Sequence, residues 1–261
     1  GAKKRARRYV ARDPRTWKKL GSSAASVDIN IQGLLPEDGA WQRIPKHDVI
    51  PLARGDISSV QVSRGKGGTF AVRVDGILAL HMALEGRLDE AREVMLDCLD
   101  DDHEEIRVAA LRGLPPLALK RHDGLLQCLS DRLLDENPKV CQAARECLAL
   151  VAPVFPSGCE EILRRELRRP ENKHRKNAFE ALRLTAENWP EAGCLHLDEL
   201  IREDDVDLRR RGSRILKVVA TKHGSTGWDL VGWSLEDEDP QVRRSASGTL
   251  VQLANAEPAI A

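Results

Sequence analysis

Histidine and cysteine are the residues of this sequence best able to bind a metal or to act as nucleophiles. The seven histidines form no H-x-x-x-H pair and no cluster with the spacing of metal ligands. The six cysteines form no C-x-x-C pair, and most fall among the apolar positions of predicted helices. We interpret them as small buried thiols in a reducing compartment. The sequence therefore predicts no catalytic residue, no metal and no cofactor.

Arginine and lysine are the other candidates, because they bind carboxylates, phosphates and acidic surfaces. One arginine recurs in a column with a 34-residue period that is missing only at Cys141: Arg73, Arg107, Arg175, Arg209 and Arg243. A denser basic patch consists of Arg164, Arg165, Arg168, Arg169, Lys173, Arg175, Lys176, Arg209, Arg210, Arg211, Arg214 and Lys217. This patch is either a solvated face balanced by glutamates or a surface that binds an acidic peptide or a nucleic-acid backbone.

Two groups of basic residues follow as candidates for binding a partner. In the body of the chain they are Arg107, Arg164, Arg168, Arg169, Arg175, Lys176, Arg209, Arg210 and Arg243. In the N-terminal arm they are Lys3, Lys4, Arg5, Arg7 and Arg8. Residues 1–20 hold nine basic residues and one acid, so they carry +8 in a chain whose net charge is zero. We expect this arm to be disordered or to form a basic helix docked elsewhere.

An internal repeat predicts the elements that position these residues. We take one position in each repeat as an anchor, and the anchors recur every 34 residues, at Ile106, Val140, His174, Leu208 and Val242. A small residue follows each anchor by four positions and a leucine by eight, and apolar residues precede it by seven and eleven. The anchor and the two later positions lie on one face of a helix, and the two earlier positions lie on one face of a preceding helix. The repeat therefore predicts pairs of antiparallel helices.

Acidic segments separate the two helices of a pair, at residues 100–102, 135–137, 203–205 and 236–239. Such residues end the first helix and cap the second, and Pro138 and Pro240 suit the first turn of a helix. Because these turns recur once in each repeat, they form an acidic stripe. The stripe is either a set of helix caps or a docking strip for basic segments, including the N-terminal arm.

The run Asp239-Pro240-Gln241-Val242-Arg243-Arg244-Ser245-Ala246 resembles the D-P-x-V-R-x-x-A signature of HEAT repeats. The resemblance implies an all-α, right-handed α–α superhelix of about five repeats, with departures at Cys141 and His174. It also implies two interpretations of the arginine column. The arginines either pair with acids of the adjacent turns as a ladder or form a ridge offered to a partner. His103-Glu104 is a pair that HEAT-repeat iron hydroxylases use in several copies, and one pair does not predict such a site.

The pattern is weaker before the repeats. Val72, Arg73, Gly76 and Leu80 match a sixth anchor, but glycines at 65, 67 and 68 disfavour a preceding helix. We therefore expect a β-hairpin over residues 60–74 and a helix over about 75–84 as a cap, with irregular chain over 21–55. The predicted domains are a basic arm (1–27), an N-terminal cap region (28–85) and a HEAT-repeat solenoid (86–261).

Together these features predict a protein–protein interaction scaffold or adaptor that binds a protein or peptide on a repeat surface and is not an enzyme. The alternative is a nucleic-acid-associated module that uses the basic arm and the arginine-rich repeats. No run of 18 uncharged apolar residues is present, so we expect no membrane span. Aromatic residues make up only 3% of the chain, fewer than a deep ligand pocket usually needs, so we expect no small-molecule substrate. We expect an intracellular, cytoplasmic or nuclear location. Because the initiator methionine is absent, we also expect a processed chain or a piece of a longer protein.

Overall fold

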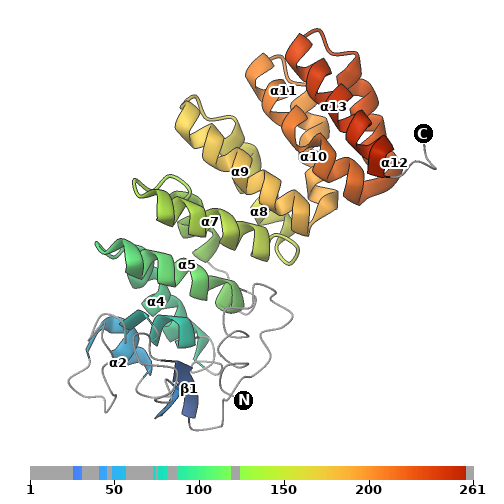
Figure 1. Ribbon diagram of the computed structural model, residues 1–261. Coiled ribbons are helices and arrows are strands. Elements are labelled where there is room, and N and C mark those ends of the chain that lie inside the picture. Colours follow the sequence, from blue (N-terminus) through green and yellow to red (C-terminus); the bar gives the residue numbers. More distant parts are fainter. Residues whose placement is uncertain are drawn as a thin grey trace. The chain divides into compact units, whose positions relative to one another are not determined.

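A computed structural model describes residues 26–30, 41–45, 49–56, 73–74, 76–80, 87–118 and 124–256. The chain divides into two compact units, unit 1 (Gly1–Val151) and unit 2 (Ala152–Ala261). Apart from one small sheet, the elements of the described residues are helices, and they follow one another as pairs (Figure 1). The prediction of an all-α array of two-helix repeats is therefore confirmed.

Unit 1 contains two helix pairs of the predicted register among its described residues. They are α4 (Leu88–Leu99) with α5 (Glu104–Ala118), and α6 (Leu125–Arg132) with α7 (Pro138–Val151). Helix α7 begins at Pro138 as predicted, and the Asn137 side chain accepts a hydrogen bond from the N–H of Lys139 at 2.9 Å. This bond satisfies a donor that has no partner inside the helix, so the acidic turn also defines where the helix begins.

Unit 2 continues the same pattern. Its elements are α8 (Pro156–Leu167), α9 (Asn172–Asn188), α10 (Pro190–Ile201), α11 (Val206–Gly212), the 3-10 helix η4 (Ser213–Ile215), α12 (Leu216–Leu235) and α13 (Pro240–Ala256). Gly224 interrupts α12 with φ 58° and ψ −133°, a backbone conformation that favours glycine. The residues of α12 before Gly224 complete the second helix that begins with α11. The residues after it form the first helix of the pair with α13.

The core follows the repeat columns. The anchors Ile106, Val140 and Val242 are 0% exposed, Leu208 is 4% exposed, and the polar anchor His174 is half-buried. Gly212 occupies a small-residue position, where an added Cβ would lie 3.2 Å from the Cβ of Leu200. The small residue therefore allows the two helices of this pair to approach closely.

The region before α4 differs from the sequence prediction. Residues 21–55 were expected to be irregular, but β1 (Ser26–Asn30) pairs antiparallel with β2 (Trp41–Pro45), and α2 (Val49–Arg54) follows. The prolines were misleading, because Pro45 ends β2 and Pro51 lies in the first turn of α2, where a missing N–H costs nothing. The expected hairpin over 60–74 lies outside the described residues except for Arg73 and Val74, which are helical and contradict it there.

The residues that follow the predicted sixth anchor, Val72, are nevertheless helical where the structure describes them. Residues 76–80 are helical, as predicted, and Leu80 is 0% exposed. A Cβ on Gly76 would lie 2.8 Å from the Cβ of Leu52 in α2, so the small-residue position again marks a close approach of helices. The division into arm, cap and solenoid stays a prediction.

Candidate interaction surfaces

The arginine column of unit 1 binds the aspartates of the inter-helix turns. Arg73 Nη2 lies 2.6 Å from Asp101 Oδ2. Arg107 donates to both oxygens of Asp135, from Nε to Oδ2 at 3.0 Å and from Nη2 to Oδ1 at 3.1 Å. In both cases the acid follows the arginine in the chain and lies in the turn of the next repeat. These arginines therefore connect neighbouring repeats.

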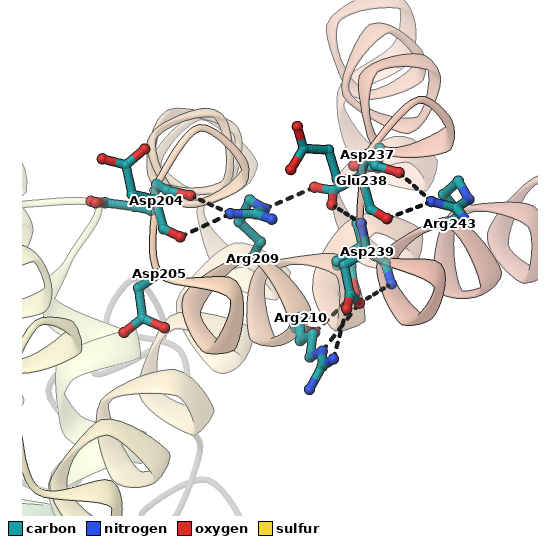
Figure 2. A network of polar contacts seen from close by, with 12 residues as sticks. Asp204, Asp205, Arg209, Arg210, Asp237, Glu238, Asp239 and Arg243 are labelled. Carbon is teal, nitrogen blue, oxygen red and sulfur yellow. Dashed lines mark hydrogen bonds and ion pairs between the residues drawn. The ribbon is translucent and has the colours of Figure 1, made fainter.

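Unit 2 contains the same contacts. Arg209 Nε lies 3.0 Å from Asp237 Oδ2, and Arg175 Nη1 lies 2.9 Å from Asp205 Oδ2. Arg209 also donates from Nη1 to the carbonyl oxygens of Glu203 and Asp204, at 2.9 and 3.1 Å. Figure 2 shows Arg209 between the turn that precedes it and the turn that holds Asp237. One guanidinium thus stabilises two consecutive turns.

The ladder aspartates have a second task. Oδ1 of Asp101, Asp135, Asp205 and Asp237 accepts the N–H of the residue two positions later, at 2.7 to 2.9 Å. The same carboxylate therefore closes its own turn through Oδ1 and binds an arginine through Oδ2, and in Asp135 Oδ1 also accepts from Arg107. Of the two interpretations of the column, the structure supports the ladder. The helix-cap interpretation of the acidic turns is supported for the same reason.

Cys141 replaces the arginine in one repeat. Its Sγ donates to the carbonyl oxygen of Asp135, six residues earlier in the chain, at 3.0 Å. Arg107 and Arg209 also donate to the carbonyl oxygen six residues before them. A thiol is too short to extend to an aspartate of a further turn, so the side chain makes the inward contact of the ladder without an arginine.

The other predicted arginines pair with acids close to them. In unit 2, Arg164 binds Glu199 at 2.7 Å and Arg168 binds Glu203 at 2.5 Å, which joins α8 to α10 and the turn after it. Arg169 pairs with Glu166, whose side chain is fully buried. Burial raises the pKa of Glu166, but hydrogen bonds from Arg169 and Arg165 outweigh it, and the pKa is lowered.

Arg210 forms an ion pair that also caps a helix. Arg210 Nη2 lies 2.6 Å from Asp239 Oδ2, while Asp239 Oδ1 accepts the N–H of Gln241 and Val242 at the start of α13. The hydrogen bond from Arg210, helped by the two backbone donors, lowers the pKa of Asp239 to about 2. Burial of the carboxylate opposes this shift.

Of the nine body residues predicted to bind a partner, seven therefore donate to carboxylates of this chain. The two others are Lys176, which is exposed and has no partner among the described residues, and Arg243, which donates only to backbone carbonyls there. The arm residues Lys3, Lys4, Arg5, Arg7 and Arg8 lie outside the described residues. The prediction that they bind a partner stays open.

Several basic side chains of unit 2 are exposed and have no carboxylate partner among the described residues, including Lys222 and Arg243. Five of them share one side of the second helices, and we call these the free basic face: Lys173, Lys176, Arg214, Lys217 and Arg244. Helical geometry of 3.6 residues per turn places all five within an arc of about 80°, opposite the buried positions of the second helices. Sequence reasoning grouped four of them with paired arginines and missed Arg244. Position relative to the anchor does not separate the two sets, because Arg210 stands two residues after its anchor, as Lys176 and Arg244 do, and is paired with Asp239.

Histidine and cysteine provide no alternative site in the described residues. No group of three or more His, Cys, Asp or Glu there could hold a metal ion. His103 lies in the turn before α5, with Nδ1 3.1 Å from Asp101 Oδ1. Burial raises the pKa of Cys98 to about 11 and of Cys159 to about 12, so these thiols stay protonated and are poor nucleophiles at neutral pH. In the part of the chain that is described, no helix has the length and apolar character that a membrane span needs.

His196 is a buried histidine of α10. It is 1% exposed, and neither ring nitrogen has a hydrogen-bond partner among the described residues. Burial lowers the pKa of this imidazole to about 4. Glu199 opposes the shift, while Arg164 and Arg168 add to it. His196 is therefore a neutral core residue at physiological pH.

Comparison with known proteins gives only distant structural similarities. No family model matches the sequence, and no curated protein matches it. A chain from the structure of Kap95p with RanGDP has 16% identity and a TM-score of 0.45, over 80% of this chain and 31% of that one. Importin beta has 16% identity and a TM-score of 0.44, over 77% of this chain and 30% of that one. This chain thus spans less than a third of either.

A designed armadillo repeat protein in complex with the peptide (KR)4 is also similar, at 15% identity and a TM-score of 0.36. The alignment covers 78% of this chain and 98% of that chain. Because the TM-scores and the identities are all low, the similarities carry no functional argument. The fold assignment depends on the helix pairs, the 34-residue register and the ladder of this chain itself.

Proposed function

We propose that this protein is an intracellular binding scaffold without catalytic activity of its own, and that the free basic face of unit 2 binds an acidic segment of a partner protein. The observation that carries this proposal is the division of the basic residues into two sets. Ladder and inter-helix arginines neutralise acids of this chain and hold the repeats together. The five residues of the free basic face have no such task among the described residues, so their charge is available to another molecule.

A protein partner is favoured over nucleic acid by the surroundings of this face. The outward positions of the second helices of unit 2 carry no aromatic side chain on which a base could stack. Residues 21–261 carry a net charge of −8, which opposes the approach of a long polyanion but permits a short acidic segment on a local basic face. The six cysteines are free, which supports a reducing, intracellular location.

The test compares charges that are free with charges that are paired. The test variant is Lys176→Gln, Arg214→Gln and Arg244→Gln, and the control is Arg164→Gln, Arg168→Gln and Arg202→Gln, which also removes three cations from the surface of unit 2. A fluorescent polyglutamate peptide serves as the probe for the full chain, with binding followed by anisotropy. We expect the test variant to lose about tenfold in affinity and the control less than about threefold.

Equal losses in both variants would refute the assignment to the free basic face. A single-stranded oligonucleotide and a DNA duplex, measured with the same proteins, address the alternative. If an oligonucleotide binds more tightly than polyglutamate, with steep salt dependence and loss of binding on deletion of residues 1–20, the nucleic-acid function replaces the one proposed.

A further inference from the structure

Trp233 of α12 places an indole ring at the surface of unit 2, where it is 59% exposed. It stands nine residues before its anchor, and the same position of the other repeats holds Asp97, Asp131 and Arg165, which are exposed, and Glu199, which is half-buried. The position therefore faces outward in all five repeats, whatever the place of the repeat in the array. An exposed tryptophan where the other repeats carry charged side chains is a candidate contact for another molecule.

A guanidinium of the neighbouring first helix covers one side of this ring. The Cζ of Arg202, which directly follows α10, lies 4.7 Å from the ring centroid of Trp233. Arg202 in turn donates from Nε and Nη2 to Oδ1 of Asp198, at 2.9 and 2.8 Å. The cation on the ring is thus neutralised and held within the chain. Because Trp233 is still 59% exposed, the ring face opposite Arg202 is open to solvent.

The surface beside the open ring face is acidic. Asp229 lies four residues before Trp233 and Glu236 three residues after it, a spacing that makes side chains neighbours along a helix. Both are exposed, and neither has a cation partner among the described residues. Residues 225–236 contain no lysine, arginine or histidine, so nothing within this segment compensates the two carboxylates. Such a surface attracts a cation and repels nucleic acid and acidic peptides.

We propose that Trp233, Asp229 and Glu236, which we call the Trp233 face, bind an arginine-rich segment of a partner protein. One arginine of the partner stacks on the open side of the indole ring, and its neighbours pair with the two carboxylates. Tryptophan is the aromatic side chain that attracts a cation best, and the planar guanidinium of arginine can stack on the ring. Arg202 already makes this contact on the other side of the same ring.

The probe is a fluorescent peptide that alternates arginine and alanine, and its binding to the full chain is followed by anisotropy. A second peptide carries citrulline, the uncharged counterpart of arginine, at every arginine position. The variant Trp233→Leu removes the aromatic ring but keeps an apolar side chain, and Trp233→Phe keeps a smaller ring. The double variant Asp229→Asn with Glu236→Gln removes the two carboxylates and leaves Trp233 in place.

We expect Trp233→Leu to weaken binding of the arginine peptide about five- to tenfold and Trp233→Phe to weaken it less. The double variant should weaken binding about fivefold in low salt and have little effect in high salt, because exposed charges are screened. The matched control is Glu161→Gln with Asp204→Asn, which removes two exposed carboxylates elsewhere in unit 2 and should weaken binding less than about twofold.

The proposal is overturned if Trp233→Leu binds the arginine peptide as the natural chain does, or if the control variant loses as much affinity as Asp229→Asn with Glu236→Gln. Equal binding of the citrulline peptide would assign the face to an uncharged partner and overturn the proposal as well. A dimer in sedimentation that Trp233→Leu abolishes would assign the face to a second copy instead. The test is independent of the free basic face, because Lys176→Gln, Arg214→Gln and Arg244→Gln together should not weaken binding of the arginine peptide.

Discussion

Units 1 and 2 have the same ladder but different outward faces. The contact of Arg107 with Asp135 in unit 1 and that of Arg209 with Asp237 in unit 2 have equal Nε–Oδ2 distances of 3.0 Å. By contrast, the outward positions two and six after the anchor hold Val108, Arg112, Gln142 and Glu146 in unit 1, whereas in unit 2 three of the six are cations without a carboxylate partner among the described residues, namely Lys176, Arg214 and Arg244. The ladder, which both units share, holds the helix pairs together. The outward positions, which differ between the units, are the candidate surface for recognition.

The largest expected effect tests whether the ladder is equivalent in the two units. The carboxylates of Asp135 and Asp237 are 5% and 7% exposed. Loss of Arg209 leaves Asp237 without its ladder cation, whereas Asp135 also has Arg132 at 3.4 Å. We therefore expect Arg209→Ala in unit 2, and Arg107→Ala combined with Arg132→Gln in unit 1, each to destabilise its unit by about 3 kcal/mol. Hydrogen exchange measured separately on α7 and α13 gives the local free energy of opening. A cost below about 1 kcal/mol in one unit only would show that the ladder is not equivalent there.

Acidification should distinguish the units through His196. His196 stands twelve residues before its anchor, and this position holds Val94, Cys128, Ile162 and Leu230 in the other repeats. The imidazole therefore occurs at this position in one repeat of unit 2. Burial lowers its pKa from 6.5 to about 4, so the neutral form contributes full stability above pH 6.5. As the pH falls from 6.5 toward 4, the unfolded chain binds the proton first, and unit 2 should lose up to about 3 kcal/mol.

Urea unfolding of the natural chain between pH 7 and pH 5 provides the measurement, with hydrogen exchange to locate the effect. His196→Leu restores the apolar residue of the other repeats and should abolish most of this pH dependence in unit 2. A slope that persists unchanged in His196→Leu would assign it to another group.

Close helix packing should tolerate a methyl group less well at Gly193 of unit 2 than at Gly113 of unit 1. A Cβ on Gly193 would lie 2.6 Å from the Cβ of Ala186, whereas a Cβ on Gly113 would come no nearer than 3.2 Å to any atom, the carbonyl oxygen of Ile77. We expect Gly193→Ala to cost about 2 kcal/mol and Gly113→Ala less than about 1 kcal/mol, by thermal unfolding. Gly232→Ala is the control, because its Cβ meets nothing within 4 Å, and it should be neutral or stabilising by about 0.5 kcal/mol.

The smallest effect concerns the exposed ion pairs that occur beside the ladder in unit 2. Arg168 is 35% exposed where it binds Glu203. We expect Arg168→Gln to reduce the free energy of unfolding by less than about 1 kcal/mol, and the difference should shrink further in high salt. A loss comparable to that of Arg209→Ala would mean that the ladder is not the main polar contact between the repeats.

Sequence reasoning reached the fold because burial depends on position along a helix. The recurrence of Ile106, Val140, Leu208 and Val242 at one spacing predicted helix pairs, and Asp135 and Asp237 were recognised as turn residues. The ladder was foreseen as one of two interpretations. The sheet of β1 and β2 was missed, because prolines at the ends of elements were treated as signs of irregular chain.

The amino-acid sequence by itself determined the 34-residue register, the helix pairs and the acidic turns, since these depend on residues close together in one repeat. Only the tertiary structure decided which cations are free. Arg209 forms an ion pair with an aspartate in the turn of the next repeat, whereas Lys176 has no such partner among the described residues. Both count equally as cations in the amino-acid composition. The physical reason is that electrostatic pairing depends on distance in space across the stacked repeats, which the fold establishes and the local sequence does not.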